Sequence, residues 1–254
     1  MNDDQRPTKA RLGRPRSNPR ETDLEPREEI LRVSARLFTT RGYTTASTRE
    51  IADEAGLRQG SLFHYFDRKQ DILAELLDRT LDFPFALHAQ LSERGLPPAE
   101  HLFLLAYADV RNLTAGHDNL GALELLPEVR ADDFASFWER RALLRTTYRT
   151  LVERGCESAV FKVSWVEVAT DLIFGLVEST ILWFDRASGG EDAEATAQAL
   201  ASGALRMVLA DSNELEAIRR QAMTHFAGLE LPVPSSLQQA GDPLAGRLLP
   251  LSWP

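Results

Sequence analysis

The sequence has a single cysteine, Cys156, in 254 residues, so the chain cannot form an internal disulfide, which is typical of the reducing cytoplasm. Its five histidines lack the spacing of metal ligands, and we expect neither a metal site nor a cofactor. No apolar run is long enough to span a membrane, since the longest candidate, residues 166–184, is interrupted by Glu167, Asp171 and Glu178. The N-terminus is polar and arginine-rich, so we expect no secretory signal.

A net positive charge is also lacking, since the formal charge is −9. Residues 1–70 contain 14 Lys and Arg against 11 Asp and Glu, a net +3, whereas residues 71–254 contain 15 against 27, a net −12. This asymmetry predicts that the N-terminal part meets a polyanion while the remainder is acidic and hydrated.

The most informative stretch begins at Ser47 and reads STREIADEAGLRQGSLFHYF. Ser47 and Glu50 have the spacing of a capping box, and Gly56 suits the left-handed turn that ends a helix. Leu62 and Phe66 then recur at helical spacing and can anchor a second helix to a core. The pattern predicts a helix-turn-helix of the kind that reads the major groove of DNA.

The polar face of this unit carries the predicted DNA contacts. Gln59 can pair with adenine in the major groove, and Arg58 can reach guanine or a phosphate. Gly60 lets the backbone come close to the groove, while Ser61 and Thr48 are placed to bind phosphates.

Residues 1–25 lack helical periodicity and are predicted to form a flexible basic arm. Within it, Arg14 and Arg16 flank a proline and can enter the narrow minor groove of A·T-rich DNA. The alternative is a hydrated tail with incidental basic residues.

The same motifs resemble the N-terminal domain of the tetracycline-repressor (TetR) family. The resemblance is carried by the runs REIA, AGL and GSLFHYF and by Lys69, and it covers about residues 27–80. It implies that Arg49 contacts bases, that Lys69 binds phosphate, and that His64 and Tyr65 approach the DNA. A core position is the alternative for Tyr65. The sequence departs from the family at Phe63, where most members carry a tyrosine whose hydroxyl binds phosphate.

We therefore expect an all-α fold with a three-helix DNA-binding domain over residues 26–70. A larger helical ligand-binding and dimerisation domain follows over residues 71–228, and residues 229–254 form a tail without periodicity. The helices are predicted over residues 27–40, 68–84, 85–93, 99–113, 132–154, 165–186, 191–209 and 213–226, with a broken segment at 118–129. Pro84 and Gly155 are expected to end helices, and 165–186 is expected to be the longest helix.

Two DNA-binding units bind more strongly than one, so we expect a homodimer on a near-palindromic operator. Small and apolar side chains on the predicted helices 165–186 and 191–209 form a stripe that favours a dimer surface, with intrachain core as the alternative. The candidates are Leu172, Leu176, Ser179, Trp183, Ala199 and Met207.

The resemblance also implies a small-molecule effector that alters the spacing of two DNA heads. Aromatic and charged residues at helical spacing suit a largely apolar effector with one polar or anionic end, such as an acyl-CoA or another carboxylate. The candidates are Phe103, Tyr107, Arg111, Trp138, Arg141, Arg145, Phe174 and Glu178. Aromatic stripes are more often core, and ion pairs with Glu139 or Glu153 would equally explain Arg141 and Arg145.

The predicted function is that of a ligand-responsive transcriptional regulator, most simply a repressor. An activator on the same scaffold is one alternative. A constitutive or architectural DNA-binding protein is another, although about 170 residues follow the DNA head. An enzyme is the rival class, but the sequence has no nucleophile elbow, phosphate loop or paired carboxylates in an apolar frame.

Overall fold

The computed structural model describes residues 24–114, 120–184, 192–227 and 229. Every regular element in these ranges is a helix, which agrees with the predicted all-α fold; Phe161 and Leu209 form an isolated antiparallel bridge. The elements are α1 (Pro26–Arg41), α2 (Thr48–Glu54), α3 (Gln59–Leu62), α4 (Lys69–Glu93), α5 (Pro98–Leu113), η1 (Leu120–Leu125), η2 (Pro127–Arg130), η3 (Asp132–Phe134), α6 (Ala135–Glu157), α7 (Val166–Glu178), α8 (Thr180–Trp183), α9 (Ala193–Arg206), η5 (Ser212–Glu214) and α10 (Leu215–Phe226).

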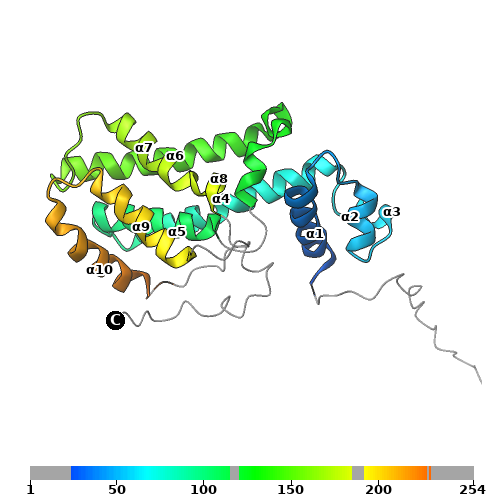
Figure 1. Cartoon of the computed structure of the whole chain (residues 1–254), viewed down its shortest axis with the longest axis horizontal. Helices are drawn as coiled ribbons and strands as arrows, with labels where there is room; N and C mark the ends of the chain where they lie inside the picture. The colour runs from blue at the N-terminus through cyan, green and yellow to red at the C-terminus, as the bar shows by residue number, and fades with distance from the viewer. Residues whose placement is uncertain (1–23, 115–119, 185–191, 228, 230–254) are drawn as a thin grey trace, which may run out of the picture.

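The helices form a small head and a larger body. Figure 1 shows α1, α2 and α3 together at one end of the molecule, and α4 leads from this head into the body. The head begins with Pro26 at the first position of α1, where its missing N–H breaks no helical hydrogen bond. Gly42 ends α1 with φ +88°, a conformation that residues with a Cβ rarely adopt.

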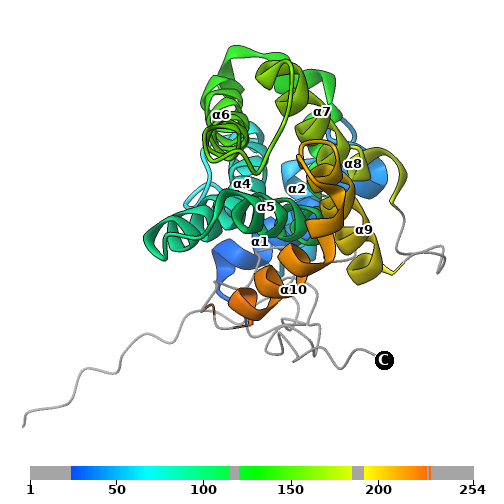
Figure 2. The same ribbon diagram turned by 90° about the vertical axis from the view of Figure 1, so that its left-hand side faces the viewer.

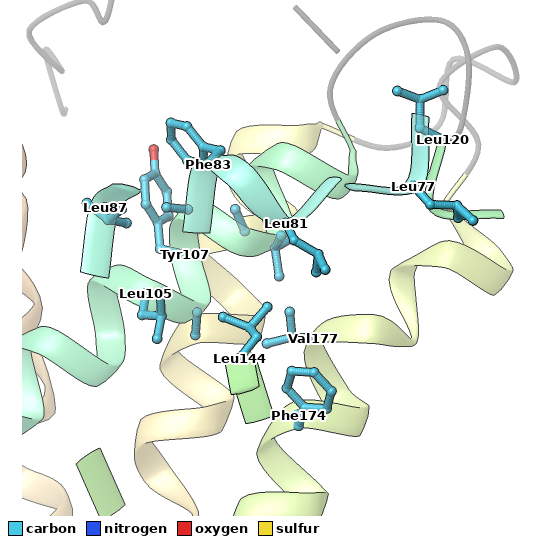
Figure 3. Packing of buried hydrophobic residues seen from close by; sticks show 14 of the residues in the cluster. Leu77, Leu81, Phe83, Leu87, Leu105, Tyr107, Leu120, Leu144, Phe174 and Val177 are labelled. Carbon is cyan, nitrogen blue, oxygen red and sulfur yellow. The ribbon is translucent and has the colours of Figure 1, made fainter. Parts of the chain in front are cut away.

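Helix α5 is the centre of the body, because thirteen of its sixteen residues are buried. It packs against α4, α6, α7, α9 and α10, and the turned view in Figure 2 shows these helices around it. Figure 3 shows side chains of four helices meeting in this core, among them Leu81 of α4, Leu105 of α5, Leu144 of α6 and Phe174 of α7. Their burial removes apolar surface from water and fixes the helices against one another.

The prediction that a helix ends at Pro84 is wrong, since α4 runs through Pro84 to Glu93. Proline lacks an N–H and leaves the carbonyl four residues earlier without its helical donor. Here that carbonyl belongs to Thr80, and the amide Nδ2 of Asn112 on α5 donates to it at 2.8 Å. The tertiary contact replaces the missing bond, so the helix continues.

Gly155 does not end the long helix as predicted, because α6 continues to Glu157. A Cβ on Gly155 would lie 1.8 Å from the Phe161 ring, so the glycine permits that ring to pack directly on the helix backbone. The chain turns after Ser158 at Ala159, whose φ is +58°.

The predicted helix 165–186 is divided at Ser179 into α7 and α8, and α4 is the longest helix instead. The hydroxyl of Ser179 donates to the Leu176 carbonyl at 2.7 Å, and that of Thr180 donates to the Val177 carbonyl at 2.9 Å. Such bonds to the preceding turn compete with the backbone pattern of a helix. Residue 186 lies outside the described residues.

The remaining predicted helices are found with shifted ends: α5 matches 99–113, α9 covers the middle of 191–209, and α10 matches 213–226. The arm residues Arg14 and Arg16 and nearly all of the tail 229–254 lie outside the described residues. None of the described helices combines the length and the apolar character needed to cross a bilayer.

Candidate functional site

Two buried anchors hold the helix-turn-helix together. Ile51 of α2 and Leu62 of α3 are fully buried, and Phe66 follows in the same core. Gly56 makes the turn with φ +66°, and the next N–H, of Leu57, donates to the Ala52 carbonyl at 2.8 Å. This geometry satisfies the last carbonyls of α2 and aims α3 away from it.

The predicted capping box at the start of α2 is half formed. The Ser47 hydroxyl accepts from the backbone N–H of Glu50 at 3.1 Å. The Glu50 carboxylate, however, binds the guanidinium of Arg41 on α1. Glu50 therefore ties α2 to α1 in addition to serving the helix terminus.

Helix α3 is shorter than the pattern predicted, with one turn of α-helix followed by tighter turns up to Phe66. The predicted DNA contacts nevertheless lie together on the outer side of α2 and α3. Arg49, Arg58, Gln59, Gly60, His64 and Tyr65 are exposed, while Thr48 and Ser61 are half-buried.

The aromatic residues after α3 also face outward. Tyr65 is 40% exposed, which excludes the core position considered for it. Phe63, the departure from the tyrosine of most family members, is 42% exposed on the same part of the head. Buried aromatic residues of the head include Tyr43, which packs edge-on against the buried Phe38.

Ion pairs neutralise most of the other arginines of the head. These pairs are Arg27–Glu75, Arg32–Glu29, Arg36–Glu54, Arg41–Glu50 and Arg68–Asp71, and Arg79 of α4 pairs with Glu28 of the head. Arg49 has one distant partner, Asp53 at 3.9 Å, and no carboxylate of the described residues pairs with Arg58. Positive charge is therefore concentrated where α2 and α3 are exposed.

Lys69 has partners that the sequence did not predict. Its Nζ donates to the carbonyls of Tyr43 at 2.7 Å and Ala46 at 2.9 Å, and it lies 4.2 Å from the centre of the Tyr43 ring. Burial lowers the pKa of Lys69. Two of its three N–H donors thus hold the turn before α2, which leaves one for a phosphate.

The body contains a polar cluster around Arg141 of α6. Its guanidinium pairs with Glu178 of α7 and, at 3.2 Å, with Glu124 of η1. It also lies over the rings of Trp138 and Phe174, at 5.4 and 5.1 Å from their centres. The structure thus brings together four of the eight predicted effector contacts, namely Trp138, Arg141, Phe174 and Glu178.

A buried pair of residues beside this cluster is absent from the eight predicted effector contacts. Asp109 of α5 accepts a hydrogen bond at 3.0 Å from the hydroxyl of Tyr148 on α6. Tyr148 also packs edge-on against Phe174. A carboxylate inside the otherwise apolar middle of α5 was the available signal, since acids are almost never fully buried without a partner.

Burial keeps these carboxyl groups hard to ionise. It raises the pKa of Asp109 to about 7, although the hydrogen bond from Tyr148 acts in the opposite direction. It also raises the pKa of Glu124 to about 7, with Glu178 adding to the rise and Arg141 opposing it. The pKa of Glu178 is raised for the same reason. Arg141 pairs with two of these acids, Glu124 and Glu178, and its charge opposes the rise in the pKa of the third, Asp109.

The other predicted effector contacts lie elsewhere. Tyr107 donates to Glu194 of α9 at 2.7 Å, Arg111 pairs with the same carboxylate, and Phe103 stacks on Tyr107. Arg145 is on the surface between α6 and α7, where it binds Asp171 at 2.6 Å and Glu167 at 2.9 Å. Its ion-pair partners are these two acids and not Glu139 or Glu153. The eight candidates do not form one site.

The predicted dimer stripe is largely exposed in the single chain. Leu172, Trp183, Ala199 and Met207 are exposed, and Ser179 is half-buried. The side chain of Leu176 on α7 contacts α9 of the same chain, since its Cδ2 lies 3.6 Å from the position that a Cβ on Gly203 would take. This contact fits the alternative of intrachain core. The sequence candidates omitted Trp165, Val168 and Leu182, whose large apolar side chains are also exposed.

An exposed set of polar side chains on a helix-turn-helix, joined to a helical body, is the arrangement of a DNA-binding regulator. Residues 30–76 match the model of bacterial regulatory proteins of the tetR family, and residues 95–208 match the tetracyclin repressor-like C-terminal domain. The chain belongs to this family. Membership confirms the predicted function as a transcriptional regulator of the ligand-responsive repressor type, and it excludes the enzyme alternative.

Individual relatives agree with this assignment. The solved structure of AmtR from Mycobacterium smegmatis is 42% identical in sequence, with 85% of this chain and 100% of that chain covered and a TM-score of 0.67. The transcriptional repressor KstR2 of Rhodococcus jostii is 28% identical over 156 residues, which are 61% of this chain and 75% of KstR2. AibR, solved with isovaleryl coenzyme A and operator DNA, is 20% identical over 73% of this chain and 98% of that chain; its TM-score of 0.60 shows a shared fold.

Proposed function

We propose that this chain represses transcription as a homodimer on a near-palindromic operator and that a small molecule bound in the body releases it. One observation carries the DNA-binding part: Arg58 and Gln59 are exposed at the start of α3, while most other arginines of the head are bound to carboxylates. Because a chromosomal operator is the target, the proposed place of action is the cytoplasm.

For DNA recognition we propose direct base contacts by Gln59, Arg58 and Arg49. Gln59 can bond bidentately to adenine, and arginine can do the same with guanine. The backbone contacts are assigned to Thr48, Gly60, Ser61, His64, Tyr65 and Lys69, with Arg14 and Arg16 in the minor groove. Phosphate contacts of this kind position the head, whereas the base contacts select the operator.

For dimerisation we propose the exposed face of α7, α8 and α9. Val168, Leu172 and Gly175 recur along one side of α7, and Gly175 has open space beside it. Ala199 and Met207 continue the surface on α9. A two-fold axis through such a face would bury both copies of each side chain and form a four-helix bundle.

For the effector we propose the cluster around Arg141, where aromatic rings and polar groups of α6, α7 and η1 meet. A largely apolar molecule with one polar end suits this composition. An acyl-CoA or another carboxylate would compete with Glu124 and Glu178 for Arg141, since both already bind it. Binding would then shift the population between two arrangements of the body.

The first test is fluorescence anisotropy of the purified protein on DNA from upstream of its coding region, at two salt concentrations with a random-sequence competitor. We expect binding that resists the competitor, with two chains per site. Binding that salt or competitor abolishes would contradict operator recognition by this form of the protein. In a separate reporter-gene assay, activation of the reporter instead of silencing would establish the activator alternative.

Gln59→Ala tests the base contact within the same assay. We expect the preference for operator over random DNA to fall by about 1–3 kcal/mol, because one bidentate base contact is lost. Gln221→Ala, which removes an exposed glutamine from α10, is the matched control and should leave this preference unchanged. An equal loss on both DNAs for Gln59→Ala would remove Gln59 from base readout.

A further inference from the structure

Polar contacts join the body to the DNA head through residues 120–134, here called the coupling segment, which comprise η1, η2 and η3. The hydroxyl of Thr44, in the turn before α2, donates to Oε1 of Glu128 at 2.5 Å. The Arg68 guanidinium, next to the start of α4, binds Asp133 at 2.9 Å. Thr44 lies in the turn whose carbonyls accept hydrogen bonds from Lys69, and Arg68 directly precedes Lys69 in the chain.

The other side of the coupling segment is fixed by α6. The indole N–H of Trp138 donates to the carbonyl of Val129 at 2.8 Å, and the Val129 side chain is fully buried. The guanidinium of Arg130 covers the same indole at 4.4 Å from its centre. The residue that bonds to the head, Glu128, is thus directly followed by a residue clamped to α6.

Arg141 connects this clamp to the polar cluster. It lies over Trp138 on α6, binds Glu124 inside the coupling segment, and binds Glu178 on α7. A change in the partners of Arg141 therefore acts on the segment at Glu124 and at the Trp138 ring. Packed networks of this kind transmit a shift when they have two discrete arrangements.

We infer that Glu128 and Thr44 are positioning residues for operator binding, and that the pairing of Arg141 with Glu124 and Glu178 sets their position through the coupling segment. The inference rests on the proposed function and specifies its regulation. In this inference, a change in the body on effector binding reaches the DNA head through the turn before α2 as well as through the continuous helix α4. Thr44 and Glu128 bind no effector and read no base in this role.

A double-mutant cycle on the full-length protein tests the inference without an effector. Glu178→Gln keeps the shape of the side chain and removes the charge that binds Arg141. Thr44→Val with Glu128→Gln removes the Thr44–Glu128 hydrogen bond to the head and leaves the Arg68–Asp133 ion pair in place. We expect Glu178→Gln to change the operator Kd by about threefold or more, within the range seen for coupled networks. In the Thr44→Val, Glu128→Gln background the same substitution should change the Kd by less than about twofold.

Asp171→Asn is the matched control, since Asp171 is also on α7 and also binds an arginine of α6, Arg145. It should leave the operator Kd unchanged in both backgrounds. An equal effect of Glu178→Gln in both backgrounds, or no effect on a folded protein, would overturn the inference. Thermal unfolding of each variant separates these outcomes from loss of fold.

Hydrogen exchange on the DNA-free protein gives a second readout that does not depend on the operator. Glu178→Gln should speed exchange of the Ala46 amide, whose N–H is bonded to the Gly42 carbonyl in the turn, and Asp171→Asn should not. This response without any operator binding would leave the coupling in place and reject the proposed function. If the protein binds the operator, but Glu178→Gln changes the Kd equally in both backgrounds and leaves the exchange rate of the Ala46 amide unchanged, only the coupling is rejected.

Discussion

Lys69 shows how one residue of the DNA-binding motif can serve the fold as well as the ligand. Its ammonium group holds the carbonyls of Tyr43 and Ala46 and lies over the Tyr43 ring. Within the part of the chain that the structure describes, no other side chain donates to these two carbonyls, so the geometry of the turn between α1 and α2 depends on the lysine. Phosphate binding by the remaining N–H would place Lys69 between the turn and the DNA backbone.

We predict that Lys69→Met lowers the free energy of unfolding by about 1–3 kcal/mol, because two carbonyls lose a charged donor. Urea unfolding measures this loss. If the third N–H binds a phosphate, the slope of log Kd against log salt also falls by about 1. Arg58→Met is the control, since Arg58 is exposed and should affect DNA binding without a loss of stability. Wild-type stability of Lys69→Met would contradict the structural role.

The sequence predicted well which side chains of the helix-turn-helix are exposed or buried, and it predicted the polar cluster of the body poorly. Gln59, Leu62 and Phe66 are placed by spacing within one short motif, so their exposure or burial follows from local pattern. The pairing of Asp109 with Tyr148 joins α5 to α6 across 39 residues, and that of Arg141 with Glu178 joins α6 to α7. Such contacts depend on helix packing, which periodicity alone does not specify.

At the scale of elements, the predicted helix ends were wrong where a tertiary contact outweighed a local sequence signal. Pro84 did not end α4 because Asn112 supplies the missing donor, and Gly155 did not end α6 because its absent side chain makes room for Phe161. Gly42 and Gly56 did end their helices, since a positive φ is a backbone requirement that acts locally. Local signals are decisive only where no neighbouring helix compensates for them.

The Pro84–Asn112 relation predicts a measurable coupling. Asn112→Ala should lower the free energy of unfolding by about 1–3 kcal/mol, because the Thr80 carbonyl is left buried without this donor. In a Pro84→Ala background the backbone N–H of residue 84 can supply the bond, so the same substitution should cost less. Urea unfolding of the four proteins in this cycle gives the coupling energy, and additive costs would show that the amide does not compensate for the proline.

At the scale of the whole molecule, the buried acids link folding to pH. Burial raises the pKa of Asp109 in the folded protein to about 7, above its ordinary value of 3.8, so between these pH values the folded protein holds a proton that the unfolded chain releases. This group therefore lowers stability as pH rises from about 4 to 7. Burial has the opposite effect on the histidine His101, whose pKa it lowers to about 3. The unfolded chain therefore binds a proton at His101 that the folded protein does not, and the stability falls as pH decreases below 6.5. The two effects oppose each other between pH 4 and 6.5.

Asp109→Asn isolates the acid from the histidine. Asparagine keeps an oxygen for the Tyr148 hydroxyl and cannot ionise, so we predict a flatter stability profile. The free energy of unfolding of the variant relative to wild type should rise by on the order of 2 kcal/mol from pH 5 to pH 8. Urea unfolding at several pH values measures this difference. Parallel profiles would mean that Asp109 titrates as an ordinary acid in the folded protein.

The exposed apolar face of α7, α8 and α9 makes the last prediction one about assembly. Leu172 is 57% exposed on this face, and Leu143 is 59% exposed on α6, a helix that does not belong to it. In a two-fold dimer each substitution occurs twice at the interface, so Leu172→Glu would introduce two carboxylates into an apolar contact.

We therefore expect Leu172→Glu to give monomers in sedimentation velocity at concentrations where the wild type is dimeric. Its affinity for operator DNA should fall more than its affinity for a single half-site, because only the full operator benefits from the linked second head. Leu143→Glu removes a leucine of equal exposure and should change neither measurement. Dimers of Leu172→Glu with unaltered operator binding would place the interface on another face of the body, and loss of dimers in both variants would point to general destabilisation, which thermal unfolding would detect.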